Sequence, residues 1–263
     1  MPLVDGRVLA AVDEAAPQGG SVGKVAEEMA ALTDLVADTP RLRGVLSDAF
    51  LPVDSKRGLL RDIVGDQLGE DTLEVAAAVL RTPSATRDVR TALAQAAIVL
   101  LVGDAQQSDL LDEVEDEVFR FARSLRQAEL RYALTDQALP AEQKHALIDD
   151  LLKGKATDQT VSLVKVIVDH LTGDISGRFY DLAEFAAGRR DRVVAEVRSV
   201  VELDDKRREA LTKALSEATG KEVDLKVILD PSILGGIVAR VGDEVLDGSV
   251  KRNLQQALYG MTR

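Results

Sequence analysis

The chain has 263 residues, of which 46% are hydrophobic and 3% aromatic, and it contains neither tryptophan nor cysteine. This apolar content excludes an intrinsically disordered chain, and the lack of cysteine excludes disulfides and thiolate metal sites. The formal net charge is −12, from 45 acidic and 33 basic residues, which disfavours nucleic acid and anionic lipid as direct ligands.

Hydropathy gives no sign of a membrane-spanning helix. The longest apolar run covers residues 96–102, whereas a spanning helix needs about 20 apolar residues. The amino terminus also lacks the basic and apolar regions of a secretory signal. We therefore expect no direct membrane insertion and a soluble chain that reaches a membrane only through a partner.

The first part of the chain is predicted to be helical. Apolar residues recur at helical spacing, and proline or glycine separates the segments. The predicted helices cover residues 2–16, 21–39, 41–48, 52–64, 72–80 and 84–102.

The pattern then repeats with an offset of 88 residues. Between positions 42 and 62 and their counterparts at 130–150, nine residues are identical without a gap. These pairs begin with Leu42 and Leu130, include Leu51-Pro52 and Leu139-Pro140, and end with Asp62 and Asp150. Such self-similarity indicates a duplicated helical unit.

Helices of the second copy are predicted at 111–125, 140–153, 158–171 and 174–190. The helix at 84–102 closes the first copy and precedes the second, so both would share it. We therefore predict a mainly α fold with one helical bundle at residues 1–102, a second at 84–191 that shares helix 84–102, and a small α/β domain at 192–263.

The composition changes after Arg192, where valines crowd into a segment that is typical of a strand. A helix at 206–219 follows and ends at Gly220 in the usual position after a helix. The further predictions are strands at 223–229, 233–241 and 244–246 and a final helix that Ser249 caps. The predicted order is β-α-β-β-β-α.

Residues typical of catalysis are sparse. His145 and His170 lie on different predicted helices without a nucleophile or ligand cluster near them in sequence, so a structural or surface role is favoured. Acidic pairs such as Asp149-Asp150 point in different directions on a helix, which favours capping or solvation over cation binding. Lys153-Gly154-Lys155 lacks the upstream glycine and strand of a phosphate loop. We expect no catalytic residue, no cofactor and no metal.

The carboxy-terminal segment carries the most specific pattern. Its residues are Asp230, Gly235, Gly236, Arg240, Gly242, Asp243, Asp247, Gly248 and Ser249. In this order, at the end of a mostly helical chain, the set resembles the signature of the delta subunit of F-type ATP synthase, which is called the oligomycin-sensitivity-conferring protein in mitochondria. We expect these residues to shape the backbone and not to contact a partner. Family members usually have one helical bundle, so this chain resembles a long form with a duplicated bundle.

The resemblance implies a non-catalytic peripheral-stalk subunit, present in one copy at the cytoplasmic face of the cell membrane. In the family, the bundle holds amino-terminal helices of the alpha subunits, and the carboxy-terminal domain binds the membrane-anchored b-type stalk. Two alternatives are weighed against this function. One is a helical adaptor of another complex, which would have no reason to keep the glycine signature. The other is an enzyme of the ATPase class, against which the missing phosphate loop argues.

Overall fold

The computed structural model describes residues 3–17, 21–136, 138–190, 192–199, 203–219, 222–229, 237–241 and 244–245. The chain divides into two compact units, Met1–Arg190 and Asp191–Arg263. The described part of the first unit is helical, and the second combines a sheet with a helix. The predicted mainly α class is therefore confirmed. None of the helices in the described ranges is long and apolar enough to cross a membrane.

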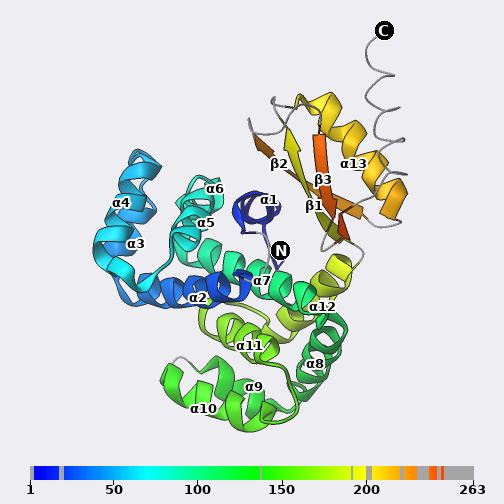
Figure 1. Cartoon of the computed structure of the whole chain (residues 1–263). Coiled ribbons are helices and arrows are strands. Elements are labelled where there is room, and N and C mark those ends of the chain that lie inside the picture. Colours follow the sequence, from blue (N-terminus) through cyan, green and yellow to red (C-terminus); the bar gives the residue numbers. More distant parts are fainter. Residues whose placement is uncertain are drawn as a thin grey trace. The chain divides into compact units, whose positions relative to one another are not determined.

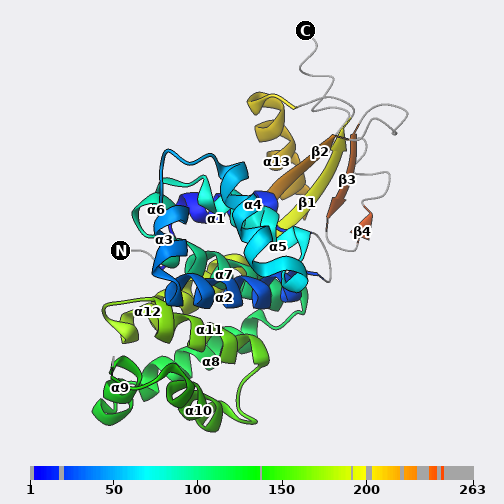
Figure 2. The ribbon, with the colours of Figure 1, turned by 90° about the vertical axis from the view of Figure 1, so that its left-hand side faces the viewer.

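The helical unit follows the predicted order of segments closely (Figures 1 and 2). Its helices are α1 (Gly6–Ala15), α2 (Val22–Asp38), α3 (Pro40–Leu46), α4 (Val53–Val64), a 3-10 turn (Gly65–Gln67), α5 (Glu70–Leu80), α6 (Pro83–Arg87), α7 (Val89–Gln107), α8 (Leu111–Ser124), α9 (Ala128–Thr135), α10 (Ala141–Leu152), α11 (Asp158–His170) and α12 (Ile175–Arg190). We call α2–α5 the first copy and α8–α11 the second copy.

Helix α7 forms the core of the helical unit. Every residue from Ala92 to Val102 is buried, as expected for a helix that is apolar on all sides. It packs against α1, α2 and α5 and also against α8, α11 and α12. Figure 1 shows α7 with α2 and α11 beside it. This helix therefore joins the elements before it to those after it.

The single helix expected at 84–102 is two helices in the structure, which corrects the prediction. Asp88 has an extended backbone (φ −153°, ψ 93°), and its side chain accepts a hydrogen bond from the backbone N–H of Thr91. Asp88 thus ends α6 and caps α7. At the other end, α7 continues through Gly103 to Gln107, because an isolated glycine does not stop a helix that packing holds.

The same helix contacts occur twice along the chain. Helix α2 packs on α7 as α8 packs on α12, α1 packs on α5 as α7 packs on α11, and α4 packs on α5 as α10 packs on α11. Helix α7 therefore has two equivalents. Among the contacts of the first copy it corresponds to α12, and among those of the second copy it corresponds to α1.

A glutamate caps a helix at the matching place in each copy. In the first copy, Glu28 Oε2 accepts hydrogen bonds from the backbone N–H of Gly69 (2.7 Å) and the hydroxyl of Thr72 (2.5 Å) at the start of α5. In the second, Glu117 Oε2 accepts from both the N–H and the hydroxyl of Thr157 (2.9 Å each) at the start of α11. A negative charge at a helix amino terminus satisfies free N–H groups and the helix dipole.

The carboxy-terminal unit is built on a sheet of order β2-β1-β3-β4. Its described elements are β1 (Arg192–Ser199), α13 (Asp205–Thr219), β2 (Glu222–Leu229), β3 (Ile237–Val241) and β4 (Glu244–Val245). Strand β1 pairs with β2 in parallel and with β3 antiparallel. A parallel pair needs a crossover, which α13 supplies. The buried residues of this small core are Ala195, Val197, Leu203, Leu211, Leu215 and Val223.

Candidate interaction site

Most of the carboxy-terminal signature lies outside the described residues. This holds for Asp230, Gly235, Gly236, Gly242, Asp243, Asp247, Gly248 and Ser249, and for the predicted helix that Ser249 would cap. The exception is Arg240, whose backbone lies in β3 opposite Glu196 of β1 and Val245 of β4. The backbone-shaping role of the signature therefore stays a prediction.

Large apolar side chains are exposed on both copies of the helical unit. The turn before α4 presents Phe50, which is 96% exposed, and α9 presents Tyr132, which is 69% exposed. Val45, Ile63 and Phe119 are partly exposed as well. Aromatic side chains are enriched at protein interfaces relative to the rest of the surface, so Phe50 and Tyr132 are candidate contacts for another protein.

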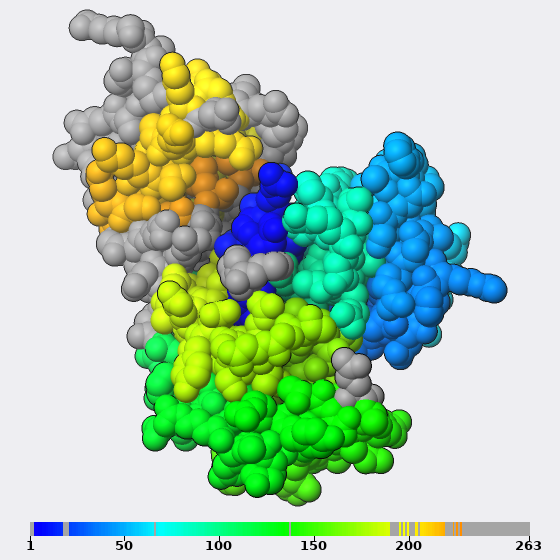
Figure 3. Space-filling model, turned by 180° about the vertical axis from the view of Figure 1, so that it is seen from behind, coloured from blue at the N-terminus to red at the C-terminus, as the bar shows by residue number. Residues whose placement is uncertain are grey.

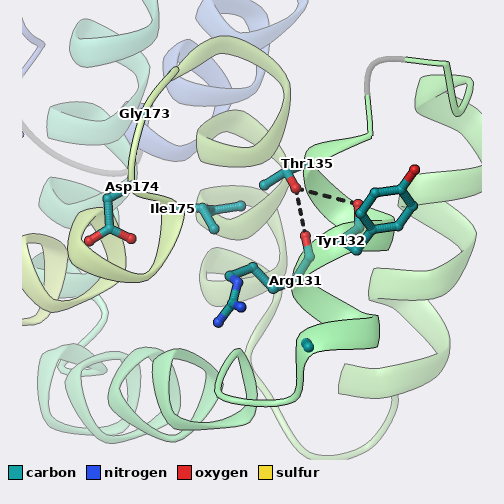
Figure 4. Close-up of a pocket in the computed structure, with 7 residues that line it drawn as sticks. Arg131, Tyr132, Thr135, Gly173, Asp174 and Ile175 are labelled. Carbon is teal, nitrogen blue, oxygen red and sulfur yellow. Dashed lines mark hydrogen bonds between the residues drawn. The ribbon is translucent and has the colours of Figure 1, made fainter.

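One of these aromatic residues borders a pocket of about 480 Å³ between α9 and the start of α12 (Figure 4). Its lining residues are Ala128, Arg131, Tyr132, Thr135, Gly173, Asp174 and Ile175. The hydroxyl of Thr135 donates to the carbonyl oxygen of Arg131 (2.8 Å) and so is already paired within α9. The pocket is open and carries one cationic and one anionic side chain, as a protein-docking surface does more often than a catalytic cleft.

A second hollow involves the glycine-containing segment Lys153–Thr157. It is lined by Glu117, Arg120, Gly154, Lys155, Ala156 and Thr157. Here the carboxylate of Glu117 occupies the amino terminus of α11, where a phosphate would otherwise bind. The structure therefore gives Thr157, at the end of this segment, a helix-capping role.

Both histidines contact a carboxylate, and the spacing of these residues in the sequence predicts neither contact. His145 Nε2 on α10 lies 2.5 Å from Asp169 Oδ2 on α11, and His170 Nε2 on α11 lies 2.8 Å from Asp34 Oδ1 on α2. The second contact spans 136 positions of sequence and joins the two copies.

A partly buried ion pair joins the first and last helices of the unit. The guanidinium of Arg189 on α12 donates to both carboxylate oxygens of Asp13 on α1, at 2.9 and 2.6 Å. Arg189 also lies over the ring of Phe185, 5.8 Å from its centroid. In Figure 3, the dark-blue α1 borders the yellow-green surface that includes α12. A bidentate pair of this kind fixes the relative orientation of the two side chains as well as adding binding energy.

Hydrogen bonds set the charge state of two capping acids. Burial by itself would raise the pKa of Glu28, but bonds from Thr72 and Gly69 outweigh it and lower that pKa below its ordinary value. Burial also opposes the shift at Asp88, whose pKa is lowered by the side chain and backbone of Thr91. Both carboxylates are therefore held in the ionised form that caps a helix.

Lys56 on α4 is buried, although lysine side chains are usually exposed. It is 2% exposed, and its Nζ donates to the carbonyl oxygen of Leu46 at the end of α3 (2.7 Å). Burial lowers the pKa of Lys56, and the nearby charge of Asp48 partly opposes this shift. The arrangement ties α4 to α3, which is a structural role.

Comparison with known proteins points to one family. A family model described as ATP synthase delta (OSCP) subunit matches residues 94–259, which is more than half of the chain. The match begins inside α7 and runs over the second copy and the carboxy-terminal unit.

Full-length relatives extend the similarity to the first copy. The chain is 40% identical to an ATP synthase subunit delta of Parafrankia sp. (strain EAN1pec), over 95% of this chain and 93% of the relative. It is 39% identical to the Frankia alni protein of the same name, over 97% and 95%, and 37% identical to that of Streptomyces griseus, over 90% and 89%. The first copy is thus shared with these relatives.

Proposed function

The chain belongs to the ATP synthase delta (OSCP) subunit family and is a peripheral-stalk subunit of F-type ATP synthase, and we propose that it acts there as a non-catalytic stator link. The similarity over nearly the whole chain carries this conclusion. A stator link must resist rotation, so it needs stiffness and tight binding instead of an active site. The buried centre of the helical unit and its capped helices support that role.

We propose that the helical unit holds the amino-terminal helices of alpha subunits. An amphipathic partner helix binds a helical bundle by placing its apolar side in a groove, and charges at the rim set its direction. Phe50 on the first copy and Tyr132 on the second offer exposed apolar contacts, and the charged residues Arg131 and Asp174 lie beside Tyr132. This surface supports the proposal without deciding between the copies.

We propose that the carboxy-terminal unit binds the b-type stalk subunit. The stalk subunit would then supply the membrane attachment, at the cytoplasmic face, with one delta chain per complex. The family match, which covers almost all of this unit, supports the assignment.

The division of the chain into three domains is also proposed. The first bundle would cover residues 1–102 and the second 84–191, with residues 84–102 in both, followed by an α/β domain at 192–263. The repeated helix contacts and the two capping glutamates support two bundles around α7. The duplicated bundle would give more contact with the catalytic head or a longer stiff connector.

The stator role is tested by removing the chain from its own complex and adding it back. Membranes that lack it should hydrolyse ATP with little ATP-driven proton pumping, and the purified chain should restore pumping. Alpha, beta and b subunits should also copurify with it from a membrane lysate. Normal pumping without the chain, or recovery of a different set of proteins, would reject the stator role and favour an adaptor of another complex.

Phe50→Ser and Tyr132→Ser form a matched pair that locates the contact with the head. Both side chains are exposed, so neither change should affect folding. The variant that lowers affinity for the head marks the copy that binds alpha. Unchanged affinity in both, and in the double variant, would place the contact away from these aromatic residues.

A further inference from the structure

A cluster of histidine and aspartate side chains lies where the first copy meets the second. Asp34 on α2 and Asp169 and His170 at the end of α11 each offer a ligand atom, and these atoms all lie within 4.8 Å of one another. His145 on α10 joins the cluster through its contact with Asp169. The proposed stator function assigns no role to this group.

The members of the cluster differ in burial, and the most exposed of them lies at the surface. The side chain of His170 is 4% exposed and that of Asp169 12%, whereas that of Asp34 is 58% exposed. The Nδ1 atom of His170 has no hydrogen-bond partner among the described residues, so Nε2 makes the polar contact of the ring. An ion can therefore enter beside Asp34 and reach a histidine nitrogen that packing holds in place.

Two ionised carboxylates this close repel each other, and a cation bound between them would relieve that repulsion. The ligand types select the cation, since Mg²⁺ and Ca²⁺ prefer sites of oxygen atoms alone, and an imidazole nitrogen favours zinc and its neighbours in the transition series. One nitrogen and two carboxylate oxygens make a three-ligand zinc site that leaves a fourth position for water.

We propose that Asp34, Asp169 and His170 bind a zinc ion that ties α2 to α11. His145 is a supporting residue, because its hydrogen bond orients the carboxylate of Asp169 in the way that metal-bound carboxylates are commonly held. In a tetrahedral site with bonds near 2.1 Å, ligand atoms lie about 3.4 Å apart. The ligand atoms lie up to 4.8 Å apart without the ion, and the exposed side chain of Asp34 can turn to bring its carboxylate closer to the other two ligands.

The bound ion would act as a cross-link. Asp34 belongs to the first copy and the other two ligands to the second. Binding to the folded chain alone would stabilise it by linkage and would hold the two copies together under load. The ion has no catalytic role in this proposal.

The test is a titration of the untagged, metal-stripped full chain with Zn²⁺, followed by calorimetry and thermal unfolding. We expect one equivalent to bind and to raise the melting temperature, while Mg²⁺ does neither. Asp34→Asn should weaken binding at least tenfold and remove the thermal shift. This variant keeps an oxygen that can accept a hydrogen bond from His170, so the fold is not at risk.

Control variants distinguish zinc binding at this cluster from nonspecific binding to surface carboxylates. Asp38→Asn removes an exposed carboxylate from the same helix and should bind Zn²⁺ as the unaltered chain does. His145→Gln should weaken binding less than Asp34→Asn. Bound Co²⁺ should show the strong visible absorption of a tetrahedral site and lose it in Asp34→Asn. Absence of one-to-one binding, or equal binding by Asp34→Asn and Asp38→Asn, would overturn the proposal.

Discussion

The two copies of the helical unit share their local architecture but differ in how deeply they are buried. In each, an arginine at the same place reaches back to a carbonyl six residues earlier, from Arg43 to Ala37 (2.9 Å) and from Arg131 to Leu125 (3.3 Å). An aspartate also closes the following turn at the same place in each copy. These contacts recur because they depend only on nearby sequence.

The lysines at equivalent positions show where the copies diverge. Lys56 is buried and bonded to the end of α3, whereas Lys144 is only half-buried. Likewise, α3 buries two leucines and α9 buries one. Local contacts can thus be kept after a duplication while burial drifts, because burial depends on what each copy packs against. Equivalent substitutions in the two copies test whether the copies are as alike in stability as they are in their contacts.

The largest effect is expected in the cores. Leu46→Ala and Leu134→Ala remove equivalent buried side chains and should each lower the free energy of unfolding by about 2–5 kcal/mol. Urea unfolding of the full chain measures both. A loss below about 1 kcal/mol in only one variant would show that the second copy does not pack as the first does.

A smaller loss is expected at the capping glutamates. Glu28→Ala and Glu117→Ala each leave helix amino-terminal donors without their acceptor and should cost about 1–3 kcal/mol. The two losses should agree within about 1 kcal/mol if the contacts are equivalent. Thermal unfolding measures both losses, and Glu27→Ala serves as the control because Glu27 is an exposed neighbour. An equal loss in Glu27→Ala would show that the effect comes from the lost charge and not from the lost cap.

The two equivalent lysines should differ in how much they contribute to stability. Lys56→Ala loses a buried stem and a hydrogen bond and should cost about 1–2 kcal/mol, whereas Lys144→Ala should stay within about 0.5 kcal/mol. Chemical denaturation measures the difference. Equal costs would mean that the deeper burial of Lys56 has no energetic consequence.

The smallest effect is expected in how the melting temperature depends on pH. Because the pKa of Glu28 is lower in the folded chain than its ordinary value of 4.5, its contribution to stability is full above that value and is lost as the pH falls through the folded pKa. The melting temperature of Glu28→Gln should therefore fall less than that of the unaltered chain between about pH 5 and 3. A Glu27→Gln control should follow the unaltered chain, and parallel curves for all three would contradict this reasoning.

Sequence patterns predicted most of the helical unit and its relation to the family. Helical spacing located the helices, and the offset between Leu42 and Leu130 indicated the repeat that the helix contacts reflect. The break at Asp88 was missed because an aspartate inside an apolar pattern can either cap a helix or face solvent. Helix α9 was not separately predicted, although its match to the segment after Pro40 was visible.

The histidine contacts could not be predicted from sequence. His170 and Asp34 are 136 positions apart, and only the packing of α11 near α2 brings them together. Arg189 and Asp13 meet for the same reason, across nearly the whole helical unit. A sequence shows which residues can pair but not which helices become neighbours. The glycine signature, by contrast, was found by sequence alone and lies mostly outside the described residues.

Helix α7 makes each copy of the helical unit depend on the other for a covered core. Either copy could be deleted only by exposing a side of this helix that the other copy does not cover, and residues Ala92 to Val102 have no polar side chain except Gln95 to offer water. A chain that lacked either copy would therefore expose apolar surface, which promotes aggregation.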